Sequence, residues 1–325
     1  MHPRRVVKFA QPFDGDVPGK KHGLKVAKAH RMEPKAVYDG GYPLARGVRL
    51  RIAAGGPGNS GLVEALSNAF IQYMVESQST KPFKIAWYLS DTIRSLEYIE
   101  HGMVDIAITH NKSAEEDSLF YGHAKKRMFA FCDRFLIVGP TEDPAELQKN
   151  ADDEHRMLSR LCRVAKSLSP NPKHLPIRFV SRGDGSATHI RECALFSRIG
   201  QAPWADIKST WYHTARNPTA QSSQATLAHA ANLSAYTLTD LGTYLSAPKN
   251  IRDKLHVFRT GNEDSDDLMM NPSRILMSAK VPGENADLVE QFMEWMDDED
   301  EGGQSIVSDF EINGQHLYSI APPGY

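Results

Sequence analysis

Cysteine is scarce in this chain of 325 residues, which has only Cys132, Cys162 and Cys193. They lie far apart, and none belongs to a CxxC motif or stands beside a histidine at the spacing of metal ligands. Neither a disulfide framework nor a cysteine-based metal site is therefore expected. We predict three reduced thiols that act as small buried hydrophobic side chains.

Long apolar runs and an excess of one charge are also missing. No run approaches the roughly 18 apolar residues that span a bilayer, and the mean hydropathy is −0.44. The 38 Lys and Arg and 40 Asp and Glu residues give a net charge of −2, without the basic stripe that nucleic-acid binders show. Residues 1–30 lack the apolar core of roughly 7–15 residues found in secretory signals. These absences predict a soluble, cytoplasmic protein with no membrane insertion and no nucleic-acid partner; the alternative is a mis-assigned start site that has replaced a real signal.

The chain does contain a regular alternation of strand-like and helix-like segments. With 41% hydrophobic residues, it is longer than the ~100–200 residues of one domain, and it can form two lobes or one large α/β unit. The predicted segments are a strand at 48–54, a helix at 60–77, a strand at 83–89, a helix at 92–102 and a strand at 104–110, then a strand at 177–181 and a helix at 189–200. This order predicts mostly parallel sheets flanked by helices.

Two glycine-rich junctions, at 53–61 and 181–189, connect a predicted strand to a predicted helix. A helix N-terminus has several backbone N–H groups without partners and about half a positive charge from its dipole, so it can receive an oxyanion. Neither junction matches GxxxxGK[ST] or the GxGxxG spacing. Nucleotide binding by those motifs is therefore not predicted.

The second junction also carries polar side chains. Arg182 offers a planar fork of donors, and Ser186 and Thr188 offer hydroxyl groups, which together suit a compact dianion. An alternative reading is a capped helix start in which Asp184 pairs with Arg182 and the other groups satisfy the backbone. Tungstate offers only acceptors, whereas hydrogen phosphate needs a carboxylate to receive its proton. If Asp184 is occupied by Arg182, tungstate, molybdate or sulfate is expected in preference to phosphate.

Six segments carry a family resemblance. They are VDIAITH (104–110), FLIVGP (135–140), FVSRGDGSATH (179–189), WY (211–212), AYTLTDLGTYL (235–245) and INGQHLY (312–318). In order and rough spacing they resemble the tungstate-binding, substrate-binding proteins of ABC transporters, over about residues 48–325. The segment RGDGSAT is also similar to the RxDGSGT loop of phosphate-binding proteins in the same superfamily, so phosphate or sulfate remains an alternative ligand.

This resemblance implies an α/β fold of the type II periplasmic-binding-protein kind, with two lobes joined by two crossing strands and the ligand between them. The lobes implied are 48–138 plus 266–325, and 139–265. Residues 1–46 then form a mobile N-terminal extension.

Combined with the junctions, the resemblance gives a set of candidate site residues. The ligand-binding candidates are Gly55, Gly56, Asn59, Ser60, Arg182, Gly185, Ser186 and Thr188, and the further candidates for the cleft are His110, Asp184, His189 and Thr237. The family's first loop has a run of Thr and Ser where this chain has Ala53 to Pro57. Backbone N–H groups must replace those hydroxyls, and each lost hydrogen bond to a charged ligand costs about 1.5–3 kcal/mol.

The predicted function is binding of a tetrahedral oxyanion, tungstate or molybdate before others, by hinge closure and without chemical turnover. No cofactor and no metal site are expected, because the 13 histidines give no HExxH or facial triad. No GxSxG or Cys/His nucleophile is recognisable either. A transporter partner stays open. Enzymes on similar folds, including fungal proteins that make a thiamine precursor, leave catalysis as an alternative.

Overall fold

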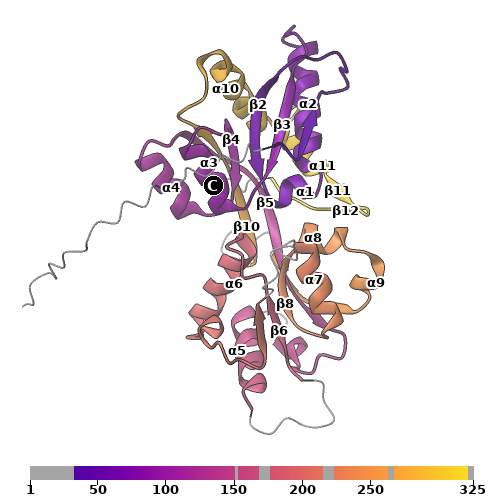
Figure 1. Ribbon diagram of the computed structural model, residues 1–325. Helices are drawn as coiled ribbons and strands as arrows, with labels where there is room; N and C mark the ends of the chain where they lie inside the picture. Colours follow the sequence, from indigo (N-terminus) through magenta and orange to yellow (C-terminus); the bar gives the residue numbers. More distant parts are fainter. Residues whose placement is uncertain (1–32, 151–152, 168–175, 215–222, 263–266, 321–325) are drawn as a thin grey trace, which may run out of the picture. The chain divides into compact units, whose positions relative to one another are not determined.

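The computed structural model of the chain describes residues 33–150, 153–167, 176–214, 223–262 and 267–320 (Figure 1). Residues 1–32, most of the predicted extension, lie outside these ranges. The strands are β1 (Ala36–Tyr38), β2 (Val48–Ala54), β3 (Lys84–Leu89), β4 (Ile106–Thr109), β5 (Ala124–Pro140), β6 (Phe179–Ser181), β7 (Tyr212–Thr214), β8 (Thr237–Asp240), β9 (Leu255–Thr260), β10 (Met270–Ser278), β11 (Glu311–Ile312) and β12 (Gln315–His316).

Helices alternate with these strands along most of the chain. They are α1 (Gly56–Asn59), α2 (Leu62–Glu76), α3 (Thr92–Glu100), α4 (Lys112–Phe120), α5 (Glu154–Ala165), α6 (Ala187–Arg198), α7 (Ser223–Asn232), α8 (Leu241–Ser246), α9 (Lys249–Arg252), α10 (Gly283–Asp297) and α11 (Gly303–Asp309), with short 3-10 turns η1 (Leu147–Asn150) and η2 (Pro203–Ala205).

The first sheet follows the order β1-β3-β2-β4-β10-β5 and then continues to β8. β2 lies parallel to β3 and β4, with Ile52 opposite Trp87 on one side and Ile106 on the other. The pattern of strands and helices correctly predicted this parallel part. β10 instead runs antiparallel to both of its neighbours, so the whole sheet is mixed.

The edge strand β1 corrects the prediction that the extension reaches residue 46. Its three residues pair antiparallel with β3, and the Lys35 N–H donates to the carbonyl of Trp87. Tyr38 is buried, which gives the segment a packed side chain. A strand of this length is too short to show an alternating pattern in the sequence.

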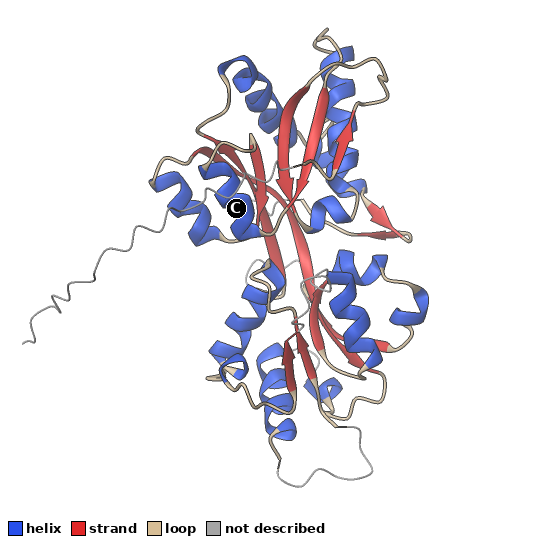
Figure 2. Cartoon of the chain, in the orientation of Figure 1, coloured by secondary structure: helices blue, strands red, loops and turns tan. Residues whose placement is uncertain are grey.

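β5 is a single strand of 17 residues that belongs to two sets of strands (Figure 2). It pairs with β10 as far as Arg134 and with β8 and β9 from Phe135 onward. We name the described residues up to 134 and from 270 onward lobe 1, and those from 135 to 269 lobe 2. The apolar half of β5 contains FLIVGP (135–140), one of the segments of the family resemblance, whereas Arg127 and Arg134 interrupt the apolar pattern in the other half.

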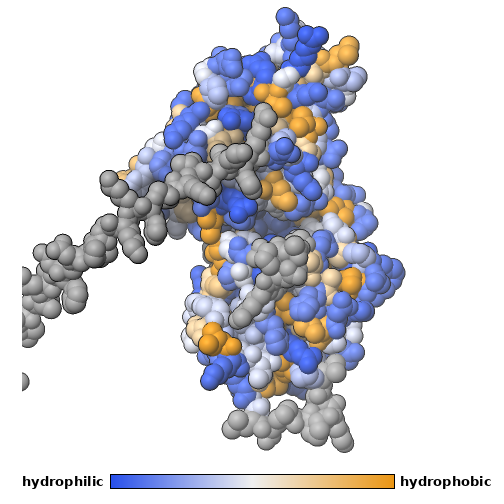
Figure 3. Space-filling model, viewed as in Figure 1, coloured by the Kyte–Doolittle hydropathy of each residue, from blue (hydrophilic) through white to orange (hydrophobic). Residues whose placement is uncertain are grey.

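Each lobe has its own hydrophobic core. In lobe 1, Phe70 packs edge-on against Phe292 with ring centroids 5.0 Å apart. In lobe 2, Phe179 stacks on Tyr212 and meets Phe196 edge-on. Outside these cores, the face of the chain seen in Figure 3 is largely hydrophilic, with hydrophobic residues in scattered patches.

Lobe 1 also buries a small group of charges beneath α4. The Glu115 side chain is fully buried; it accepts from the Thr109 hydroxyl at 2.7 Å and from Nε of Arg127 at 2.9 Å. Nε of Arg274 lies 4.0 Å from the same carboxylate. A buried carboxylate is tolerated only with such partners, so this group ties α4 to β4, β5 and β10.

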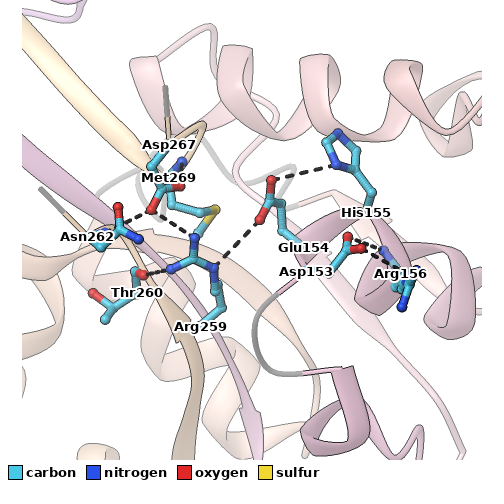
Figure 4. A network of polar contacts seen from close by, with 9 residues as sticks. All are labelled: Asp153, Glu154, His155, Arg156, Arg259, Thr260, Asn262, Asp267 and Met269. Atoms are coloured by element: carbon cyan, nitrogen blue, oxygen red, sulfur yellow. Dashed lines mark hydrogen bonds and ion pairs between the residues drawn. The ribbon is translucent and has the colours of Figure 1, made fainter. Parts of the chain in front are cut away.

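In lobe 2, a second polar network holds the chain where it leaves β9 and returns toward β10 (Figure 4). Arg259 lies between two carboxylates, 2.8 Å from Asp267 and 3.6 Å from Glu154. Asp267 also accepts from the backbone N–H groups of Asn262 and Met269, both at 2.8 Å. This network holds both ends of the segment that leads from β9 to β10.

Candidate functional site

Three loops begin side by side at one edge of the lobe 1 sheet. β3, β2 and β4 are adjacent and parallel. Ser90 follows the carboxyl end of β3, Gly55 follows that of β2, and His110 follows that of β4. In open α/β sheets, ligands bind outside the carboxyl ends of the strands. This edge, which contains the first glycine-rich junction, is therefore the part of lobe 1 suited to a ligand.

The first junction forms a short helix, α1, before the long one. Gly61, with φ of 95°, then begins α2. The N–H groups of Asn59 and Ser60 donate to the carbonyls of Gly55 (3.1 Å) and Gly56 (2.9 Å), so the turn itself uses two of the expected backbone donors. The N–H groups of Gly55 and Gly56 have no hydrogen-bond partner among the described residues and remain available.

Packing beneath α1 explains the glycines of this junction. A Cβ on Gly58 would lie 2.1 Å from the indole of Trp87, which in turn donates from Nε1 to the carbonyl of Ala54 at 2.9 Å. The Ser60 hydroxyl lies 2.8 Å from that of the buried Tyr318. The end of the chain thus supports the first junction through Tyr318, a contact that sequence spacing could not reveal.

The second junction begins α6 in the expected way. Ser186 is the N-cap, and its hydroxyl accepts from the N–H of His189. Asp184 accepts from Nε (3.0 Å) and Nη2 (2.6 Å) of Arg182 and from the Ser186 N–H. The pairing of Arg182 with Asp184, one of the two readings of the sequence, is present. The N–H groups of Ala187 and Thr188 have no partner among the described residues, so the helix start keeps open donors.

Electrostatics leave the side chains of this junction nearly neutral. Burial raises the pKa of Asp184, but the Arg182 guanidinium and the hydrogen bonds from Ser186 outweigh it, so this pKa lies below its ordinary value. Burial and the nearby Arg182 lower the pKa of His189, against the effect of Asp184. Arg182 and Asp184 then cancel at neutral pH, and attraction for an anion comes from the helix dipole and the open N–H groups.

Both junctions approach the turn between β3 and α3. A Cβ on Gly55 would lie 2.7 Å from the Ser90 carbonyl oxygen, and a Cβ on Gly185 would lie 3.3 Å from Cδ1 of Ile93. α8 of lobe 2 also contacts α1. Residues 90–93 were not among the predicted site residues. The sequence signal that could have identified them is Asp91, a helix-capping residue directly after a strand, which caps α3.

The remaining candidates have structural partners. His110 lies at the carboxyl end of β4, where burial lowers its pKa to about 4 against the opposite effect of Glu115 and Asp240; the residue keeps some exposed surface, but its Nδ1 is buried. His189 accepts from the Gly185 N–H at 3.0 Å. The Thr237 hydroxyl donates to the carbonyl of Val180 at 2.7 Å, which links β8 to β6. None of these contacts tests a ligand role.

Two α/β lobes with separate cores, linked through β5 and β10 and carrying glycine-rich loops at strand ends, define the class of two-lobed, type II periplasmic-binding-protein-like folds. The predicted fold class is confirmed. The chain belongs to the PBP superfamily domain family, which matches residues 76–299.

Several known proteins are similar over most of this chain. A crystal structure described as a periplasmic protein with a suggested metal-binding role is 40% identical, covers 89% of this chain and 99% of its own, and has a TM-score of 0.78. The tungstate-binding protein TupA of Peptoclostridium acidaminophilum is 27% identical over 67% of this chain and 68% of its own. The structure of the tungstate ABC transporter from Geobacter sulfurreducens is 25% identical, covers 80% of this chain and 98% of its own, and has a TM-score of 0.61.

These comparisons correct the predicted location. The family is that of periplasmic binding proteins, and the 40% identical relative is periplasmic, so the prediction of a cytoplasmic protein is wrong. That prediction rested on the composition of residues 1–30 alone. None of the helices in the described ranges is long and apolar enough to cross a membrane. The same ranges hold no group of three or more His, Cys, Asp or Glu residues arranged for a metal ion.

Proposed function

We propose that this protein binds a tetrahedral dianion, tungstate or molybdate, between the 55–60 loop of lobe 1 and the 182–188 loop of lobe 2, and that it does so without chemical turnover. The observation that carries the proposal is the start of α6, where the N–H groups of Ala187 and Thr188 have no partner among the described residues and the same loop holds Arg182 fixed through Asp184. Such a site consists of donors, and a fully deprotonated oxyanion offers only acceptors.

The state of Asp184 favours tungstate and molybdate over phosphate. Both of its oxygens are occupied, one by Arg182 and the other by the Ser186 N–H. Its lowered pKa keeps it ionised, and three of its roughly four lone-pair sites already accept hydrogen bonds from Arg182 and the Ser186 N–H, so it is a poor acceptor for the proton of hydrogen phosphate. One of the similar proteins is named as tungstate-binding and another as a tungstate ABC transporter, which supports the same choice.

Ligand capture would use the two strands that connect the lobes. β5 changes partner between Arg134 and Phe135, where Met270 of β10 lies opposite Arg134. A twist confined to these positions would bring the second junction toward the first, as in hinge closure. The two moving bodies that we propose are lobe 1 and lobe 2, whose bounds lie within a few residues of the expected 48–138 plus 266–325 and 139–265. The site would then close in the periplasm, where the 40% identical relative resides.

Isothermal titration calorimetry of the full chain with tungstate, molybdate, sulfate and phosphate tests this function. We expect tungstate and molybdate to bind with the greatest affinity and phosphate to be rejected. Thr188→Val, which keeps the side-chain shape but removes the hydroxyl, should weaken tungstate binding about tenfold, since one hydrogen bond to a charged ligand contributes about 1.5–3 kcal/mol. Thr226→Val removes another buried hydroxyl in lobe 2 and should leave affinity unchanged. Preference for phosphate would refute the choice of anion, and equal loss in both variants would refute the site.

A further inference from the structure

A buried carboxyl group lies beneath the second junction and has no role in the function proposed so far. Glu192 stands on α6, 2% exposed, and its Oε1 accepts from the Tyr212 hydroxyl at 2.5 Å. Its Oε2 is buried without a hydrogen-bond partner. Ser181, the residue directly before Arg182, is fully buried, and its hydroxyl acts on the pKa of both Glu192 and Tyr212. The cluster therefore connects α6 and β7 to the strand that leads into the anion loop.

Among the described residues, no cation acts on the pKa of this carboxyl group. The charged group that acts on it is Asp184, which has the same sign, and burial together with Asp184 raises the pKa of Glu192 to about 8. Tyr212 faces it from β7 and Cys193 from α6, and burial keeps the pKa of both above the ordinary values, so both are neutral near pH 7. α5, which packs on α6, adds apolar side chains and the thiol of Cys162 to the shared core. An unpaired buried carboxylate is strongly disfavoured, so the group is held as the neutral acid.

The protonation of Glu192 decides the net charge that an anion meets at the junction. With Glu192 neutral, Arg182 and Asp184 cancel, and the donors of the helix start prevail. With Glu192 ionised, the same junction carries one net negative charge that its buried surroundings screen poorly. We propose that Glu192 is a proton-controlled gate: the site takes a dianion while Glu192 is protonated and loses it when Glu192 ionises. This inference rests on the proposed oxyanion function and adds its pH dependence.

Linkage makes the expected effect quantitative. If binding requires the protonated form, the apparent Kd is constant below about pH 8 and rises about tenfold for each further pH unit. Tungstate is a suitable probe because it stays a dianion from pH 7 to 9.5. Binding at pH 8.5 should also take up about three quarters of a proton, which calorimetry detects as a dependence of the heat on the buffer's ionisation enthalpy.

The test is calorimetric titration of the full chain with sodium tungstate at several pH values from 7 to 9.5. Glu192→Gln keeps an acceptor for Tyr212 but cannot ionise, so its Kd should stay flat and no proton should be taken up. Tyr212→Phe removes the hydrogen bond that stabilises the ionised form, so its Kd should begin to rise at a higher pH than in the wild type. A merely structural role of Glu192 would produce neither change.

Failure of the gate and failure of the function give different results. Wild-type protein that binds tungstate at pH 7 and equally well at pH 9 would overturn the gate alone, as would a Glu192→Gln variant with the wild-type pH slope. Wild-type protein that does not bind tungstate at pH 7 would overturn the proposed function, and the gate with it.

Discussion

Arg182 offers the sharpest test of the second junction, because its guanidinium is committed to Asp184 while it is expected to face the ligand. The pair is mostly buried, with side-chain exposures of 16% and 11% and a shortest distance of 2.6 Å. Arg182→Ala leaves Asp184 as an unpaired carboxylate next to the anion. We expect tungstate affinity to fall by at least ~2 kcal/mol, about 30-fold in Kd, and the free energy of unfolding to fall by about 3 kcal/mol.

The double variant Arg182→Ala with Asp184→Ala separates direct contact from charge compensation. Removing both charges restores a neutral junction, so the free energy of unfolding should return to within about 1 kcal/mol of the wild type. Tungstate affinity should not return, because the donors of Arg182 are still missing. Calorimetry gives the affinities and urea denaturation gives the stabilities. Arg178→Ala, which removes a guanidinium bound to the Leu233 carbonyl in the same lobe, is the matched control.

Two results would refute this reasoning. Wild-type affinity in the double variant would mean that Arg182 only neutralises Asp184 and does not contact the anion. Unchanged affinity in Arg182→Ala alone would remove Arg182 from the site.

Three further predictions concern the supports of the site. The folded-state pKa of His110 is about 4 against an ordinary 6.5, so unfolding takes up a proton between these pH values, and the stability present above pH 6.5 should fall by up to roughly 3 kcal/mol by pH 4. In thermal melts across that window, the melting temperature of His110→Gln should depend less on pH than that of the wild type. Equal pH dependence in the two proteins would contradict the assignment. Gly58→Ala should destabilise the chain by about 1–3 kcal/mol through overpacking, whereas Gly56→Ala, where a Cβ meets nothing within 4 Å, should not do so by that mechanism; equal denaturation midpoints would argue against the packing described. Glu115→Gln should cost about 3–5 kcal/mol because it breaks a buried ion pair, while Glu116→Gln, half exposed, should stay within about 0.5 kcal/mol; a small loss at Glu115 would show that its partners rearrange.

The sequence predicted those parts of the fold whose signals are local. The strand 48–54 and the helix starting near residue 189 follow from apolar periodicity, and they agree with β2 and α6 to within a few residues. β10 and the first half of β5 escaped because buried charged and polar residues, including Arg274 and Asp133, interrupt their patterns. Those residues are tolerated through partners that lie far away in the sequence, which no local pattern records.

The candidate site was predictable to a similar degree. The order strand, glycine turn and N-cap serine identified the start of α6, and the choice between a free and a paired Arg182 needed the geometry of Asp184. The use of the Asn59 and Ser60 N–H groups inside α1 could not be foreseen, because a four-residue helix leaves no periodic signal. Tyr318, which supports Ser60 from near the end of the chain, shows the same limit for long-range contacts.

The position of β10 in the sheet determines the order in which the two lobes become able to fold. β10 lies between β4 and β5 in the sheet, yet it is translated after all of lobe 2. Until it emerges, the nascent chain carries two strands with unpaired backbone edges, the kind of surface on which aggregation begins. Lobe 2, continuous in sequence, can complete its core first. A chain that ends before residue 270 would therefore have a second lobe that can fold attached to an open sheet, and such a product should depend on chaperones because its central strand is missing.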